Sequence, residues 1–167
     1  MATIELYLIR HGLAADPDDE HPDDAKRPLT PEGVSRLRRE AKGLQALGVT
    51  FDQILTSPLV RARQTAEVFA QAQDEKVPVA QVEALAPGGT PAQVVHALAE
   101  YARRKAIALV GHEPNLGELA AKLLGTRAPV PFKKGAICCI EFDALPPARP
   151  GTLAWFATPK MLRKLGT

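Results

Sequence analysis

Cysteine is scarce in this sequence, and its placement argues against a disulfide framework. Only two of the 167 residues are cysteine, and these two, Cys138 and Cys139, are neighbours in the chain. They lie in an apolar run typical of a strand, where successive side chains point to opposite faces, so no disulfide is expected between them. We therefore predict two buried free thiols, which suit a reducing cytoplasm.

Long hydrophobic runs and a strong net charge are also missing. The first apolar run is only about six residues long and follows no basic region, which argues against a secretory signal. No stretch reaches the length of a membrane span. The formal net charge is +2, from 21 basic and 19 acidic residues, which gives no strong attraction to nucleic acid. The sequence predicts a cytoplasmic protein with neither a membrane nor a nucleic-acid partner.

The pattern of apolar residues predicts strands that alternate with helices. Helical apolar spacing follows each of four pairs that end in proline, a residue that suits the first helical position. The pairs are Thr30-Pro31, Ser57-Pro58, Thr90-Pro91 and Glu113-Pro114. Strands are expected at 4–9, 52–56, 79–84, 106–110, 136–142 and 152–157.

This alternation sets the expected fold class. It predicts an α/β protein, a three-layer sandwich with a mostly parallel central sheet and helices on both faces. The last two strands have no helix between them and are expected to form an antiparallel hairpin at one side of the sheet. No repeat, low-complexity tract or linker divides the chain, so we expect a single domain over residues 1–167.

Three of the predicted strands end in residues that can bind phosphate. One ends at Arg10-His11-Gly12 and another at Gly111-His112, while the strand at 52–56 runs into a helix that carries Arg61. Because ligands bind outside the carboxyl ends of parallel strands, we expect these side chains to meet. Arginine suits phosphate oxygens bidentately. Gly12 is expected to allow a sharp turn and the close approach of a ligand.

The spacing leaves some alternatives at this site. Arg61 and Arg63 are two residues apart and cannot share one helix face, so the sequence does not decide which one enters the site. Ser57 as a nucleophile with His112 as its base is disfavoured, because Ser57 precedes a proline as a helix cap does. A metal site is disfavoured because the histidines lie beside arginines, whose charge repels a cation.

Together these motifs resemble the histidine phosphatase superfamily, whose fold is called phosphoglycerate mutase-like. The resemblance rests on four ordered segments: Leu8 to Gly12, Arg27 to Gly33, Ser57 to Ala66, and Gly111 to Leu116. The short length and the forms Arg-Pro-Leu-Thr and Gly-His-Glu-Pro-Asn-Leu are most similar to the small SixA-type phosphohistidine phosphatases. The resemblance implies this fold and a phosphatase that needs no cofactor.

The resemblance also implies a mechanism. His11 attacks the phosphorus and forms a covalent phosphohistidine intermediate, which water then hydrolyses. Arg10, Arg61 and His112 bind the phosphate oxygens, with Gly12 beside them, and the arginines supply the positive charge that a metal would otherwise provide. The expected partner is a protein that bears phosphohistidine, such as a phosphotransfer domain, or a small phosphorylated substrate.

The superfamily's phosphomonoesterases use a general acid that has no evident counterpart here. That acid would follow Leu85, where this chain has Ala86 and Pro87. Glu83 is expected to face solvent on a strand, and Glu113 to order a helix start. A site without a committed acid favours phosphohistidine, because imidazole leaves more easily than an alkoxide. The alternatives are a small-molecule phosphomonoesterase that uses Glu83 or Glu113, and a phosphate- or phosphoprotein-binding module without turnover.

Two charged segments accompany these motifs. The segment Asp16 to Asp24 carries six acidic residues and is expected to be a solvated loop that would repel acidic substrates if it lay over the cleft. Arg27 is expected to fix this loop through Asp23 or Asp24. The pair Lys133-Lys134 is expected to be solvated, with attraction of an anionic partner as the alternative.

Overall fold

Six strands form one mixed sheet in the computed structural model, which describes residues 3–167. Their spatial order is β3-β2-β4-β1-β5-β6. The first four in this order are parallel, while β5 pairs antiparallel with both β1 and β6. The strands are β1 (Ile4–Arg10), β2 (Gln53–Thr56), β3 (Val79–Gln81), β4 (Ala106–Gly111), β5 (Ile137–Phe142) and β6 (Thr152–Ala157). The mostly parallel sheet and the antiparallel hairpin are both confirmed.

The central strands are apolar on both faces, so both faces need a helical cover. On β1, Leu8 packs into the core on one side of the sheet and Ile9 into the core on the other. The neighbouring strand β5 divides Cys138 and Cys139 between the same two cores. Both cysteines are buried free thiols, as predicted.

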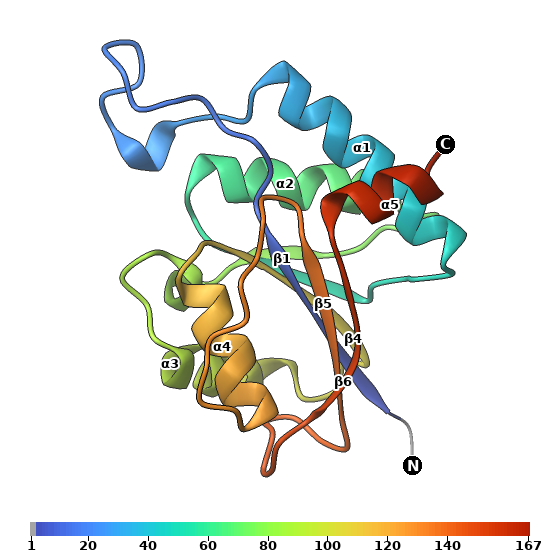
Figure 1. Ribbon diagram of the computed structural model, residues 1–167. Helices are drawn as coiled ribbons and strands as arrows, with labels where there is room; N and C mark the ends of the chain where they lie inside the picture. Colours follow the sequence, from blue (N-terminus) through green and yellow to red (C-terminus); the bar gives the residue numbers. More distant parts are fainter. Residues whose placement is uncertain (1–2) are drawn as a thin grey trace.

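Helices lie on both faces of this sheet (Figure 1). The helices on one face are α1 (Pro31–Ala46), α2 (Val60–Gln71) and α5 (Pro159–Leu165). Those on the other are α3 (Pro91–Ala97) and α4 (Asn115–Leu124). The short 3-10 helices are η1 (Asp24–Lys26), η2 (Glu83–Leu85) and η3 (Leu98–Tyr101). The predicted three-layer sandwich is therefore present. Among residues 3–167, no helix has the length and apolar character needed to span a bilayer.

Three helices begin at a Thr-Pro pair, because threonine caps the free N–H groups and proline suits the first helical position. Thr30 accepts a hydrogen bond from the backbone N–H of Gly33, and Thr90 does the same for Gln93. These two starts were predicted. Thr158 caps α5 in the same way, a helix that was not predicted although its sequence carries the same signal.

The two other predicted helix starts are slightly wrong. α2 begins at Val60 instead of Pro58, and α4 begins at Asn115 instead of Pro114. Neither helix receives a side-chain cap from its N-cap residue. Ser57, which precedes Pro58, contacts His112 instead, whereas Glu113, which precedes Pro114, accepts from the backbone N–H of Gly117 in the first turn of α4.

The strand predicted at 79–84 is shorter than expected. β3 ends at Gln81, and the backbone N–H of Val82 makes a last contact with the Thr56 carbonyl at 2.9 Å. The chain then turns into η2, where Leu85 donates to the Val82 carbonyl. β3 is an edge strand with largely exposed side chains, so little burial favours its extension. Glu83 consequently lies in η2 and not on a strand, and it is exposed as expected.

Candidate active site

The register of the strands brings two histidines together at one edge of the sheet. Arg10 of β1 pairs with Gly111 of β4, so His11 and His112 follow at the same level. Their ring centres are 5.1 Å apart. β2 ends beside them, because the backbone N–H of Ser57 donates to the Val110 carbonyl at 3.0 Å. The three strand ends therefore meet, as the sequence led us to expect.

One ring nitrogen of His11 forms a hydrogen bond to the backbone, and the other is free to react. Its Nδ1 lies 2.8 Å from the Gly12 carbonyl oxygen, which can only accept, so Nδ1 carries the proton and Nε2 keeps its lone pair. The residue is 5% exposed. Burial lowers the pKa of His11 to about 3, with a further lowering from the charges of His112, Arg61 and Arg10. At neutral pH the ring is neutral, which is the form that a nucleophile requires.

The turn at Gly12 is tied to α2 by two hydrogen bonds. The Gly12 N–H donates to Thr65 Oγ1 at 3.1 Å, and the Thr65 hydroxyl donates to the Arg61 carbonyl at 2.8 Å. A Cβ atom at Gly12 would lie 2.7 Å from Cδ1 of Leu37 in α1. Gly12 does not have a positive φ, so glycine is required here by the close packing of α1 and not by the sharp turn that we expected.

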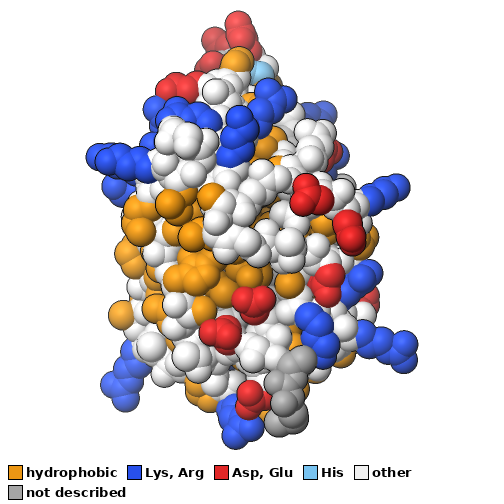
Figure 2. Space-filling model, turned by 90° about the vertical axis from the view of Figure 1, so that its right-hand side faces the viewer, with side chains coloured by type: hydrophobic (Ala, Val, Ile, Leu, Met, Phe, Trp, Pro, Cys, Tyr) orange, Lys and Arg blue, Asp and Glu red, His pale blue; other side chains and the backbone are white. Residues whose placement is uncertain are grey.

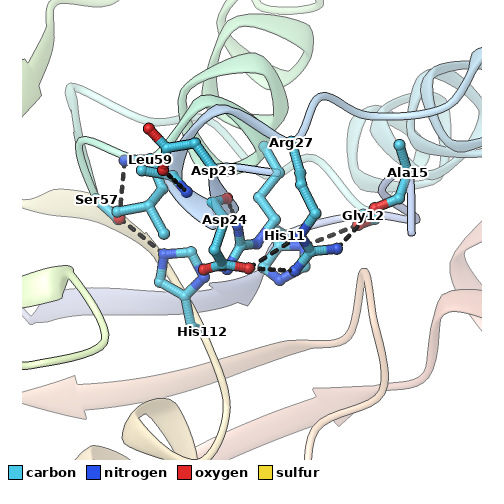
Figure 3. Close-up of polar contacts among 11 residues, drawn as sticks. His11, Gly12, Ala15, Asp23, Asp24, Arg27, Ser57, Leu59 and His112 are labelled. Atoms are coloured by element: carbon cyan, nitrogen blue, oxygen red, sulfur yellow. Dashed lines mark hydrogen bonds and ion pairs between the residues drawn. The ribbon is translucent and has the colours of Figure 1, made fainter. Parts of the chain in front are cut away.

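His112 is oriented by Ser57 (Figure 3). Its Nε2 lies 2.7 Å from Ser57 Oγ, which also accepts a hydrogen bond from the backbone N–H of Leu59 at 3.2 Å. We assign the Ser57 hydroxyl proton to Nε2, because no other acceptor for it is present among residues 3–167; the proton of the neutral ring is then on Nδ1. Burial, followed by the charge of Arg61, lowers the pKa of His112 to about 4. His112 therefore offers a neutral Nδ1–H donor.

The contact between Ser57 and His112 does not make a hydrolase triad. A triad needs a carboxylate on the second ring nitrogen, whereas Nδ1 of His112 has no hydrogen-bond partner among residues 3–167. Ser57 itself is fully buried. We assign it the role of orienting His112, which the sequence did not suggest because a Ser-Pro pair is typical of a helix cap.

Arg61, and not Arg63, points toward the two histidines. The Arg61 side chain is 6% exposed and donates to the Asp24 carbonyl at 2.7 Å and to the Asp24 carboxylate at 3.2 Å. Arg63 instead folds back and donates to the Pro58 carbonyl at 3.1 Å. The structure thus resolves the choice that the spacing left open.

Asp24 links the acidic loop to the site. Its carboxylate lies 2.8 Å from one guanidinium nitrogen of Arg27. The other terminal nitrogen of Arg27 donates to the Ala15 carbonyl at 2.7 Å. Arg27, and after it Arg61, lowers the pKa of Asp24, which is therefore a carboxylate at neutral pH. Figure 3 shows the Asp24 side chain beside Arg27 and His112. Arg27 was expected to fix this loop through Asp23 or Asp24, and Asp24 is its partner.

Glu113 has a structural position next to Arg10. Its two carboxylate oxygens accept from the backbone N–H groups of Gly117 at 2.6 Å and Phe132 at 3.1 Å. The Phe132 carbonyl in turn accepts from Arg10 at 2.8 Å. Glu113 therefore orders the start of α4, as expected, and also fixes the segment that holds Arg10.

Three nitrogens of this cluster are buried and lack a hydrogen-bond partner among residues 3–167: Arg10 Nε, Arg61 Nε and His112 Nδ1. The charges of these three residues all act on the pKa of His11, so the three residues lie near its ring. Unpaired buried donors are uncommon, and such a set around a free imidazole nitrogen suits the oxygens of a phosphoryl group. Within the same residues, no three His, Cys, Asp or Glu side chains gather in a way that could hold a metal ion.

Comparison with known proteins agrees with this chemistry. Residues 6–86 match the family model of the histidine phosphatase superfamily (branch 1). An uncharacterized protein of Picosynechococcus sp. (strain PCC 7002) is 48% identical over 120 residues, which cover 70% of this chain and 71% of that protein. The phosphohistidine phosphatase SixA of Escherichia coli (strain K12) is 28% identical over 163 residues, which cover 96% of this chain and 97% of that protein.

A solved structure extends the similarity to the whole fold. The protein histidine phosphatase SixA, complexed with tungstate, superimposes with a TM-score of 0.84 at 27% identity, over 95% of this chain and 99% of that chain. The chain belongs to the histidine phosphatase superfamily and is SixA-like.

Proposed function

We propose that this protein is a phosphohistidine phosphatase that removes phosphate from phosphohistidine on proteins, with His11 as its nucleophile. The observation that carries the proposal is the state of His11: it is buried and neutral, Nδ1 is fixed on the Gly12 carbonyl, and Nε2 is free. The SixA relative is a phosphohistidine phosphatase, and we extend that activity to this chain. We treat residues 1–167 as one histidine phosphatase domain.

The proposed reaction has two displacements at phosphorus. In the first, Nε2 of His11 forms a bond to phosphorus while the bond between phosphorus and the substrate imidazole breaks, and the departing imidazole takes a proton from solvent. In the second, water attacks the phosphohistidine at His11, the new P–N bond breaks, and inorganic phosphate leaves. The second step restores neutral His11.

Positive charge for both displacements is proposed to come from the chain's own donors. Arg10 and Arg61 bind phosphoryl oxygens through their guanidinium groups, and His112 donates through Nδ1. We include Gly12, which directly follows His11, in the proposed phosphate site. These groups meet the charge requirement of phosphoryl transfer, so we propose that the enzyme works without a metal ion or another cofactor.

The choice of phosphohistidine over phosphate esters is supported by the positions of the two candidate acids. Both carboxylate oxygens of Glu113 already accept backbone hydrogen bonds, and Glu83 is exposed in η2. An alkoxide leaving group requires protonation, whereas imidazole does not need a dedicated acid. Because the buried thiols Cys138 and Cys139 suit a reducing compartment, we further propose that the enzyme acts in the cytoplasm.

The test is metal-free release of inorganic phosphate from a phosphohistidine-bearing protein and from a panel of phosphomonoesters, with His11→Ala as the reference. We expect faster hydrolysis of phosphohistidine and no turnover by His11→Ala. Faster hydrolysis of the esters would instead indicate a phosphomonoesterase with an acid at Glu83 or Glu113. Phosphate binding without turnover of any substrate would indicate a binding module.

A further inference from the structure

A basic groove lies next to the catalytic pocket. It has a volume of about 540 Å³ and runs between α1, α5 and the turn that precedes β5. This volume is within the range of ligand pockets, about 300–1,000 Å³. Five of the lining side chains are basic: Arg36, Lys133, Lys134, Lys160 and Arg163. The groove is therefore large enough to receive several side chains of another molecule.

Most of this positive charge is not neutralised within the chain. Arg36 forms an ion pair with Glu32 at 2.7 Å. The other four basic side chains of the groove form no ion pair within residues 3–167. Figure 2 shows Lys and Arg side chains gathered in the upper part of one face, below a tip that is rich in Asp and Glu. The groove thus has positive charge available for an external anion.

The acidic residue of the groove, Glu40, does not cancel this charge at neutral pH. Glu40 is 2% exposed, and its Oε1 has no hydrogen-bond partner among the described residues. Burial raises the pKa of Glu40 to about 8, against the opposing effect of Arg163 and Arg36. The carboxyl group is therefore mainly protonated at pH 7.

Residues on two sides of the groove adjoin residues of the candidate active site. Gly12 and Leu13, which directly follow His11, form part of its wall. On its other side, the pair Lys133-Lys134 follows Phe132, whose carbonyl accepts from Arg10. A protein that brings a phosphoryl group to His11 therefore places neighbouring residues along this groove.

We propose that the groove is the docking surface for acidic side chains that surround the phosphohistidine of the protein substrate. This inference rests on the proposed function. Carboxylates of Asp or Glu match the unpaired Lys and Arg side chains of the groove, and such charge complementarity raises the rate of encounter and fixes orientation. The groove would thus select among phosphohistidine proteins by the residues around the modified side chain, while His11 acts on the phosphoryl group itself.

A nucleic acid fits these features less well. Single-stranded nucleic acids bind through aromatic side chains on which the bases stack, in addition to positive charge. None of the described residues that line the groove is aromatic. The net charge of the whole chain is only +2. The charge is therefore local to one groove, which suits a local acidic segment of a protein.

The test compares two phosphohistidine peptides that differ only in whether Glu or Gln flanks the phosphohistidine. The readout is the ratio of the two kcat/KM values, measured by phosphate release, because an effect on the chemical step cancels in this ratio. At low ionic strength we expect the wild type to favour the Glu peptide by about tenfold. The variant Lys134→Glu/Lys160→Glu should lose or reverse this preference. Both side chains are exposed, so we expect this variant to fold.

A matched control changes the same amount of charge outside the groove. Lys122 and Arg127 are exposed and do not line the groove. The variant Lys122→Glu/Arg127→Glu should keep the wild-type preference for the Glu peptide. Loss of the preference in this control to the same extent would overturn the groove proposal, because it would show an effect of net charge alone.

The outcomes separate this proposal from the proposed function. Equal hydrolysis of both peptides by the wild type would overturn the groove and leave the phosphatase activity standing. If neither peptide is hydrolysed, the proposed function fails, and equilibrium binding of the unphosphorylated peptides decides on the groove. The groove proposal would be supported if the wild type binds the Glu peptide and Lys134→Glu/Lys160→Glu does not. Equal binding of both peptides by the wild type would overturn the groove proposal. Tighter binding of a single-stranded oligonucleotide of equal length would overturn it in favour of nucleic acid.

Discussion

The acidic loop lies beside His112 and the basic groove beside His11, and the two relate to the candidate site differently. The loop reaches into the pocket, where Asp24 pairs with both Arg27 and Arg61. The basic side chains of the groove stay outside the pocket, and four of the five have no ion-pair partner within residues 3–167. The loop therefore acts on a residue proposed to bind phosphate, whereas the groove can act only on a molecule that arrives from outside.

This difference changes the role expected for the loop. We expected its acids to repel acidic substrates over the cleft. The contact between Asp24 and Arg61 indicates a more local effect, since a phosphoryl group must share Arg61 with a carboxylate that is already bound. Repulsion by the rest of the loop is weaker, because its other acids are exposed and therefore screened by salt.

The largest effect is expected from the arginine that the loop contacts. Arg61→Ala should lower kcat/KM by about 10²–10³, because a donor to the developing phosphoryl charge is lost. Arg63→Ala removes the same charge from the same helix and should change kcat/KM only slightly, since Arg63 bonds to the Pro58 carbonyl. Phosphate release by the two variants on one substrate checks this. Equal losses would mean that Arg61 has no special position.

Removal of the Asp24 charge tests the effect of the acidic loop on phosphate binding directly. Asp24→Asn should strengthen inhibition by inorganic phosphate by roughly two- to fivefold, because one negative charge near the proposed phosphate site disappears and its 60% exposed side chain is partly screened by solvent. The control is Asp19→Asn, which changes an exposed acid of the same loop and should leave the inhibition constant unchanged. Weaker inhibition in Asp24→Asn would show instead that Asp24 is needed to hold Arg61 in place.

For the groove, the corresponding test is the pH dependence of stability that we expect from Glu40. The folded-state pKa of about 8 lies above the ordinary value of 4.5. Between these values the folded chain keeps a proton that the unfolded chain has lost, so the free energy of unfolding falls as the pH rises. The charges that face Glu40 and moderate this effect belong to Arg36, Lys133, Lys134, Lys160 and Arg163.

The expected slope is at most about 1.4 kcal/mol per pH unit for one proton. Glu40→Gln should remove this contribution. Between pH 5.5 and pH 8, the free energy of unfolding of the variant should therefore fall less steeply than that of the wild type, and the difference in slope should correspond to about one proton. Denaturant unfolding at several pH values measures the slope. Glu67→Gln, an exposed position on α2 that forms no ion pair within residues 3–167, is the control and should follow the wild type. If the free energy of unfolding of Glu40→Gln changes with pH in parallel with that of the wild type, the prediction is contradicted.

The smallest effect is expected at the segment that joins the groove to Arg10. Glu113→Gln replaces one of two carboxylate acceptors by an amide, so the segment at Phe132 should loosen and kcat/KM should fall only a few-fold. Glu83→Gln should have no effect on phosphate release. A loss of about 10² or more in either variant, confined to ester substrates, would identify the general acid that we consider absent.

The sequence predicted those features that depend on local pattern. Alternating and apolar runs identified all six strands, and the Thr-Pro pairs at Thr30 and Thr90 identified two helix starts, because capping is a local interaction. The meeting of His11 and His112 was predictable because parallel strands place their carboxyl ends together. The end of β3 was not, since an edge strand stops where burial becomes insufficient.

The contacts that complete the site depend on segments that are distant in sequence. Spacing could not choose between Arg61 and Arg63, because the choice depends on where the loop carrying Asp24 folds. It also gave Ser57 the role of a cap, although the hydroxyl is used to orient His112, 55 residues away. The groove combines Lys134 with Lys160 from separate elements, and no local pattern connects them.

One hydrogen-bonded link has a consequence for how this enzyme can diversify. Thr65 accepts from the turn that follows His11 and donates to the backbone of Arg61, so one side chain connects the proposed nucleophile to a proposed phosphate ligand. Apart from the contact between Asp24 and Arg61, the loop and the groove take no part in this connection. Their sequences can therefore change to suit a new partner while the spacing between nucleophile and cation stays constant.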